Sequence, residues 1–191
     1  VGADTAGMIL SEAPHQREAM TLLVDIGTNA EIVLGNNERL VAASSPTGPA
    51  FEGAQISSGQ RAAPGAIERV RIDRETLEPY YQVIGSEMWS NESGFEKDTK
   101  GLDITGICGS GIIEVIAEMY LAGILSQDGV INGALAEKSK HIIPDGRTFS
   151  YVLSQGKHNI QVTQNDVRAV QLAKAALYAG IRLLMERMEI E

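Results

Sequence analysis

The chain has 191 residues, the size of a single domain or of one lobe of a larger domain. Hydrophobic residues make up 43% and charged residues 21%, which is close to the averages of globular proteins and excludes a disordered chain. Sixteen lysines and arginines against 25 acidic residues give a formal net charge of -9, which disfavours binding to nucleic acid or to acidic membrane surfaces.

The only cysteine, Cys108, rules out an internal disulfide bond and an iron–sulfur cluster held by this chain alone. This cysteine usage favours a cytoplasmic protein. Three acidic residues interrupt the most apolar stretch, 102–125, so we expect no transmembrane helix. The chain begins without methionine and its last residues continue a helical pattern, so we expect it to be part of a longer polypeptide.

The first part of the chain predicts one helix followed by three strands. The helix is expected over residues 3–12 and is broken by Pro14. Turn residues separate the three apolar runs that follow, Gly27-Thr28-Asn29 after the first and Gly35-Asn36-Asn37 after the second. We therefore expect an antiparallel three-strand meander. Its strands are expected at residues 21–26, 31–34 and 39–43.

A loop region and a second hairpin are expected next. Residues 44–65 are rich in glycine and proline and predict loops, with at most a short helix near residues 51–57. Residues 66–72 and 80–84 alternate as two strands of a hairpin. The polar stretch 86–101 predicts a surface loop.

Two long helices and a third hairpin are expected in the rest of the chain. One helix starts at Gly109 and ends before Gly123, which suits a left-handed cap. Residues 149–153 and 160–162 suggest the hairpin. The last helix starts at Thr163-Gln164-Asn165-Asp166, which resembles a capping box with Asp in place of Glu or Gln. Its apolar face would carry Val170, Ala173, Leu177, Ile181, Leu184 and Met188.

The sharpest motif is Asp25-Ile26-Gly27-Thr28-Asn29, at the end of the first strand. Gly27 permits a tight turn in which the amides of Gly27, Thr28 and Asn29 can point at one anion. The Thr28 hydroxyl and the Asn29 amide add donors. Asp25 cannot coordinate a phosphate, so it would hold Mg²⁺ or orient a water beside the phosphates. The alternative is an ordinary hairpin turn in which Asp25 and Thr28 satisfy local amides.

A second motif, Gly106-Ile107-Cys108-Gly109-Ser110-Gly111, opens a helix. Free amides and the positive end of the helix dipole could form an anion cradle there. It is not a dinucleotide fingerprint, because Glu114 stands where the third glycine should be and no parallel βαβ unit surrounds it. The alternative is that the glycines let the helix start pack closely against another backbone segment.

Two weaker features complete the candidates. Cys108 could be the nucleophile of a thiol hydrolase, but no histidine shares a motif with it, so a buried apolar role is favoured. The three histidines of the chain do not have the spacing of a metal site either. In the loop of residues 45–54, Glu52 could face a metal or a partner, and the nearby Arg61 could face a phosphate.

Taken together and in this order, these motifs resemble the C-terminal part of the reductive activators of corrinoid enzymes. Such a family protein couples ATP to the reduction of cob(II)alamin to cob(I)alamin. The resemblance implies an α/β fold, a ribonuclease-H-like lobe of the actin, Hsp70 and sugar kinase (ASKHA) type with inserted hairpins and long helices. It rests on Val1-Gly2-Ala3-Asp4-Thr5, residues 25–36, Gly48-Pro49-Ala50-Phe51-Glu52-Gly53-Ala54, Arg61-Ala62, Gly65-Ala66-Ile67, residues 106–111 and Gln171-Leu172-Ala173-Lys174-Ala175-Ala176.

The resemblance also implies roles for individual residues. Residues 25–29 would be the second phosphate loop, with Asp25 as the catalytic residue and metal ligand. The cofactor-binding residues would be Gly27, Thr28, Asn29, Glu52 and Gly109. The chain departs from the family pattern at Ser45-Pro46, at Thr47 and at the Gln60-Arg61 pair, and we expect none of these departures to touch the phosphate loop.

The same resemblance implies cofactors, partners and domain limits. Residues 1–191 would form a partial ASKHA domain, while a ferredoxin domain with a 2Fe–2S cluster and an adenosine-binding segment would lie outside the chain. The cofactor would be MgATP, and the partner a corrinoid protein or a corrinoid-dependent methyltransferase, with a homodimer as a further option. The chain alone is expected to be inactive. The alternative is an interaction module in which the apolar stripe of the last helix docks a corrinoid protein or a second copy.

Overall fold

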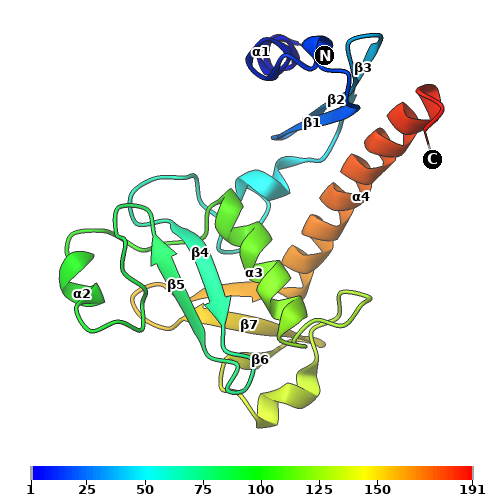
Figure 1. Ribbon diagram of the computed structural model, residues 1–191. Coiled ribbons are helices and arrows are strands. Elements are labelled where there is room, and N and C mark those ends of the chain that lie inside the picture. Colours follow the sequence, from blue (N-terminus) through cyan, green and yellow to red (C-terminus); the bar gives the residue numbers. More distant parts are fainter. Residues whose placement is uncertain (1, 191) are drawn as a thin grey trace. The chain divides into compact units, whose positions relative to one another are not determined.

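The computed structural model describes residues 2–190, which form two compact units (Figure 1). Unit 1 contains the described residues up to Pro49 and those from Leu172 onward, whereas unit 2 spans Ala50–Gln171. Among the described residues, no helix is long and apolar enough to cross a membrane.

Unit 1 is built on the predicted antiparallel meander, with strand order β1-β2-β3. Ile26 of β1 pairs with Ala30 of β2, so Gly27, Thr28 and Asn29 alone form the turn between them. The predicted helix and three strands are confirmed, although β3 continues two residues past the predicted end at residue 43. The elements are α1 (Ala3–Glu12), the 3₁₀ helix η1 (Pro14–Gln16), β1 (Thr21–Ile26), β2 (Ala30–Gly35) and β3 (Leu40–Ser45).

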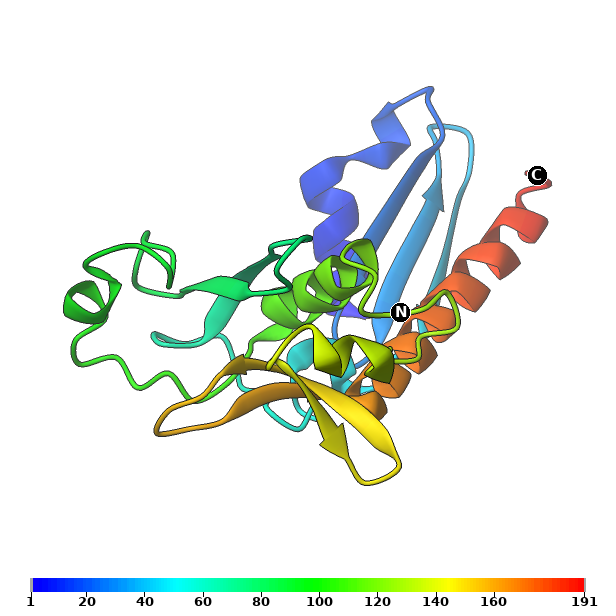
Figure 2. The same cartoon turned by 90° about the horizontal axis from the view of Figure 1, so that it is seen from below.

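Two helices cover opposite faces of this meander (Figures 1 and 2). On one face, Ile32 and Leu34 pack against the second half of α4 (Gln164–Arg187), whose Leu184 is buried with them. Gly180 permits the close approach, because an added Cβ would lie 2.7 Å from Ile32 Cδ1. On the other face, Thr5 of α1 donates a hydrogen bond to Glu31 at 3.1 Å. Side chains alternate between the faces of a strand, so β2 serves both helices.

The apolar stripe predicted for the last helix is therefore not available for docking. Leu177, Ile181 and Leu184 lie in the core of unit 1 against the meander. The alternative of an interaction module loses the observation on which it rested.

Unit 2 combines a hairpin, a three-stranded sheet and helix α3. The largest fully buried side chains include Ile67, Ile107, Ile112, Met119 and Tyr151. The elements are η2 (Pro49–Glu52), β4 (Ile67–Ile72), β5 (Pro79–Val83), α2 (Phe95–Asp98), α3 (Gly109–Leu121), η3 (Gly133–Glu137), β6 (Ile142–Asp145), β7 (Thr148–Ser154) and β8 (Ile160–Thr163).

Three expectations for this unit are corrected. The short helix expected near residues 51–57 is a 3₁₀ turn that ends at Glu52. The polar loop 86–101 contains the short helix α2. The third hairpin is a sheet of three strands, because β6 pairs antiparallel with β7. The β4–β5 hairpin, the start of α3 and the left-handed Gly123 (φ 73°) are as predicted.

The outer edge of β4 is closed by the segment that leads into α3. Ile67 accepts a hydrogen bond from the Cys108 amide at 3.0 Å. Further along the strand, the carboxylate of Glu114 accepts a hydrogen bond from the Val70 amide at 2.6 Å. The carboxylate of Glu118 accepts one from the Ile72 amide at 3.2 Å. Residues at i and i+4 lie on one face of a helix, so both carboxylates reach the same strand.

The start of α4 is fixed by the predicted capping box. Asp166 accepts a hydrogen bond from the Thr163 amide at 2.8 Å, and the Asp166 amide donates to the Thr163 hydroxyl at 3.2 Å. The other carboxylate oxygen of Asp166 accepts from the amide and hydroxyl of Ser57, at 2.8 and 3.0 Å. The box therefore also anchors the loop that follows η2.

Candidate functional site

The turn between β1 and β2 is the first candidate site. Asp25, Thr28 and Asn29 are exposed and Gly27 is half-buried, so the turn lies at the surface of unit 1. Its position follows from the pairing of Ile26 with Ala30, which leaves only three residues to reverse the chain. The four residues that the sequence assigned to phosphate and metal binding thus occupy one exposed strand end.

Thr47 holds this turn from its inner side, contrary to the expectation that it would not touch the phosphate loop. Its hydroxyl donates to the Gly27 carbonyl at 2.8 Å and is 3.1 Å from the Thr28 carbonyl. The Gly48 amide also donates to the Thr28 carbonyl, at 2.9 Å. Sequence reasoning missed Thr47 because the contact spans about twenty residues and depends on where β3 ends.

Asp25 faces a second carboxylate across the sheet. It is paired in register with Glu31, which in turn is paired with Ser44, so the three side chains share one face of the meander. The Ser44 hydroxyl donates to Glu31 at 2.8 Å and lowers the pKa of that carboxyl, and Thr5 donates to its other oxygen. Glu31 is thereby bound to hydroxyl donors, and Asp25 is the exposed carboxylate nearest the turn.

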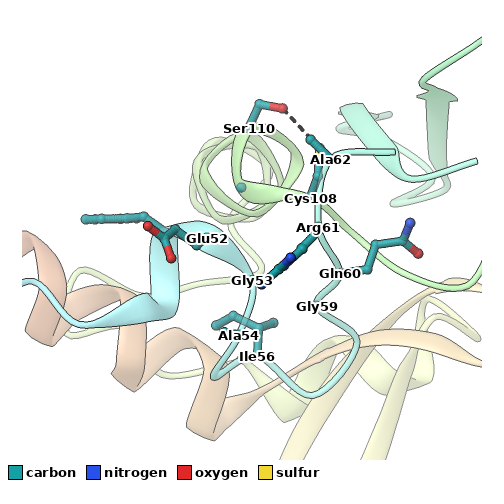
Figure 3. A pocket seen from close by; sticks show the side chains of 12 residues that line it. Glu52, Gly53, Ala54, Ile56, Gly59, Gln60, Arg61, Ala62, Cys108 and Ser110 are labelled. Atoms are coloured by element: carbon teal, nitrogen blue, oxygen red, sulfur yellow. Dashed lines mark hydrogen bonds between the residues drawn. The ribbon is translucent and has the colours of Figure 1, made fainter. Parts of the chain in front are cut away.

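A second candidate site is a cavity of about 740 Å³ in unit 2 (Figure 3). Glu52 and Gly109, the remaining predicted cofactor-binding residues, both line it. Arg61, the candidate phosphate ligand, also reaches it. The other residues around it are Phe51, Gly53, Ala54, Ile56, Gly59, Gln60, Ala62, Cys108 and Ser110.

The glycines at the start of α3 serve close packing. A Cβ on Gly109 would lie 2.1 Å from the Phe51 carbonyl oxygen, and one on Gly111 would lie 2.4 Å from the Ile67 carbonyl oxygen. Real Cβ atoms do not approach so closely, so only glycine fits. The packing alternative for this motif is therefore realised, and Gly109 in addition forms part of the cavity wall.

Cys108 behaves as a buried residue of this packed region. Its side chain is 1% exposed, and its sulfur lies 3.3 Å from both the Ile67 carbonyl and the Ser110 hydroxyl. A thiol nucleophile needs access to substrate, so the thiol hydrolase alternative has no support in this arrangement.

A metal at Asp25 would take most of its ligands from elsewhere than this chain. Residues 2–190 contain no cluster of three or more His, Cys, Asp or Glu side chains that could hold an ion. Mg²⁺ is commonly bound by one or two carboxylates together with substrate phosphates and water. The exposed Asp25 carboxylate beside the turn fits that mode of binding.

Known proteins are similar to this chain in sequence and in fold. Residues 19–191 match the family described as the C-terminal domain of RACo, the ASKHA domain. Two relatives are a corrinoid activation enzyme, RamQ, of Eubacterium limosum (37% identical, covering 100% of this chain) and the [Co(II) methylated amine-specific corrinoid protein] reductase of Methanosarcina barkeri (32% identical, covering 94%). Both alignments cover 31% of the relative, so the chain spans about a third of their length.

One solved structure is similar to this chain in both fold and sequence. The reductive activator for a corrinoid, iron–sulfur protein superposes on all of this chain with a TM-score of 0.83 and 34% sequence identity. The match covers 28% of that activator. The expected α/β fold is therefore confirmed.

Proposed function

Because the chain belongs to the family of RACo C-terminal ASKHA domains, we propose that it is the phosphate-binding part of an ATP-dependent reductive activator. The substrate would be the cobalt(II) form of a corrinoid held by a partner protein, which gains one electron and becomes cobalt(I). The observation that carries the proposal is the exposed turn of Gly27, Thr28 and Asn29 beside the Asp25 carboxylate.

The residues of unit 1 have complementary tasks in this proposal. The amides of Gly27, Thr28 and Asn29 and the Thr28 hydroxyl bind phosphate oxygens, because a tight turn presents several donors to one anion. Asp25 would hold Mg²⁺ or orient a water beside the phosphates. Glu31 keeps its own carboxylate turned to Ser44, which leaves Asp25 as the cation ligand. MgATP, when bound, supplies the free energy for an otherwise unfavourable reduction.

Glu52 and Gly109 are the proposed cofactor-binding residues of unit 2. At the cavity of that unit, Glu52 would face a metal and the Gly109 backbone would contact the ligand. Arg61 on the same cavity offers a positive charge to a phosphate.

The electron must come from outside this chain. Iron–sulfur clusters are held by several cysteines, and the chain contains only Cys108, which is buried and free. We use "full-length protein" for the natural polypeptide that contains this chain. We propose that the 2Fe–2S cluster and the adenosine-binding segment lie in other parts of that full-length protein. The proposed partner is a corrinoid protein or a corrinoid-dependent methyltransferase. A homodimer is a second assembly to test. The proposed compartment is the reducing cytoplasm.

The test replaces Asp25 by asparagine in the full-length protein. MgATP binding is measured by calorimetry, and the conversion of cobalt(II) to cobalt(I) in the corrinoid partner by absorbance. We expect a roughly 100-fold loss of ATP-dependent reduction, because about 3 kcal/mol of charge stabilisation by the cation is lost. Asp128→Asn, which changes an exposed carboxylate on a loop of unit 2, is the matched control. Equal MgATP binding and reduction by Asp25→Asn and wild type would remove the assigned role.

A further inference from the structure

The carbonyl groups of the β1–β2 turn are held by one short stretch of chain, residues 45–48, which we name the clamp segment. Thr47 is only 6% exposed, and its hydroxyl carries a single proton. That proton is shared between the Gly27 carbonyl at 2.8 Å and the Thr28 carbonyl at 3.1 Å. The Gly48 amide gives the Thr28 carbonyl a second donor, at 2.9 Å.

These bonds fix the direction of two peptide groups. The carbonyl of Gly27 and the amide of Thr28 belong to one planar trans peptide, in which the C=O and N–H bonds point in opposite directions. The same holds for the carbonyl of Thr28 and the amide of Asn29. Since both carbonyls point toward Thr47, both amide groups point away from it.

An anion at the turn needs this orientation. If either peptide flipped, a carbonyl oxygen would replace an N–H group as the neighbour of the phosphate, and attraction would become repulsion. Donors that are oriented before the ligand arrives contribute more than donors that must reorganise on binding. Resting on the proposed function, we infer that Thr47 is a positioning residue that presets the Thr28 and Asn29 amides for phosphate.

The clamp segment is itself anchored within unit 1. The Thr47 amide donates to the Ser45 carbonyl at 2.9 Å, and the Ser45 hydroxyl donates to the Ala176 carbonyl of α4 at 2.6 Å. Gly48 adopts a positive φ of 71°, which turns the chain after Thr47. The hydroxyl of Thr47 is therefore held in place by both β3 and α4.

Three variants of the full-length protein test this role by calorimetric titration with MgATP. Thr47→Val keeps the shape of the side chain but removes the hydroxyl, and we expect about tenfold weaker binding, equivalent to about 1.4 kcal/mol. Thr47→Ser keeps the hydroxyl and should bind within about twofold of wild type. Thr99→Val is the matched control, because Thr99 is another buried threonine whose hydroxyl donates to a backbone carbonyl, that of Phe95 at 2.8 Å.

The results separate this inference from the proposed function. Wild-type affinity in Thr47→Val, equal weakening in Thr47→Ser, or equal weakening in Thr99→Val would each overturn the positioning role. If wild type itself does not bind MgATP, the proposed function is wrong. A crystal structure of Thr47→Val without nucleotide then decides on the clamp alone: carbonyls turned away from position 47 support it, and unchanged peptide orientations overturn it.

Discussion

Replacing Asp166 by alanine should strongly lower the free energy of unfolding of unit 2. Asp166 is 2% exposed and accepts from three donors, the Thr163 amide and the amide and hydroxyl of Ser57. Alanine leaves the buried Thr163 amide without a partner, which costs about 2 kcal/mol. Loss of the cap and of the tie to Ser57 adds about 1–2 kcal/mol. The expected total is a loss of about 3–4 kcal/mol in the free energy of unfolding.

Trp89 makes this loss measurable in unit 2 by itself. It is the only tryptophan of the chain and lies within Ala50–Gln171, so its fluorescence in urea follows the unfolding of that unit. Asp166→Asn keeps one acceptor oxygen and should cost about half as much. Asn165→Ala changes the exposed neighbouring residue and should stay within about 0.5 kcal/mol of wild type. A loss below about 1 kcal/mol in Asp166→Ala would refute the reasoning, because buried donors would then not need this carboxylate.

Two further predictions concern α3. Burial acts to raise the pKa of Glu114, but hydrogen bonds from Arg71 and from the β4 backbone outweigh it and lower that pKa. A carboxylate whose pKa is lowered by folding stabilises the protein at pH values above its unfolded-state pKa of about 4.3. The urea midpoint of wild type should therefore fall as the pH drops below about 4.3, and the midpoint of Glu114→Gln should fall less steeply. Parallel pH profiles of the two proteins would contradict this prediction. Gly109→Ala places a Cβ within 2.1 Å of the Phe51 carbonyl oxygen and should lower the free energy of unfolding by at least about 2 kcal/mol in the same fluorescence assay. Ser110→Ala is the control and should not lower it. Equal urea midpoints for the two variants would show that the start of α3 can shift freely.

Much of unit 1 could be predicted from the sequence because its signals are local. Apolar runs separated by Gly27-Thr28-Asn29 and Gly35-Asn36-Asn37 leave few ways to pair three strands. The candidate turn was found for the same reason, since its residues are contiguous. The capping box at Thr163 and Asp166 is also a local pattern, and the structure confirms it.

The features that sequence reasoning missed depend on contacts between distant residues. β6 is four residues long and contains Pro144, which predicts against a strand but is tolerated at an edge. The predicted third strand ended at residue 43, whereas β3 continues to Ser45. Those two additional residues bring Thr47 beside the turn, so a small error in a strand boundary concealed its hydrogen bonds to Gly27 and Thr28.

The hydrogen bonds that cover the outer edge of β4 affect how readily this protein can aggregate. A strand edge normally sealed by another strand is here sealed for part of its length by two side chains, Glu114 and Glu118. Removing both carboxylates would leave the Val70 and Ile72 amides unpaired on an otherwise folded protein. A strand edge with unpaired amides can pair with a strand of another chain. We therefore expect the loss of both glutamates to promote aggregation of the protein.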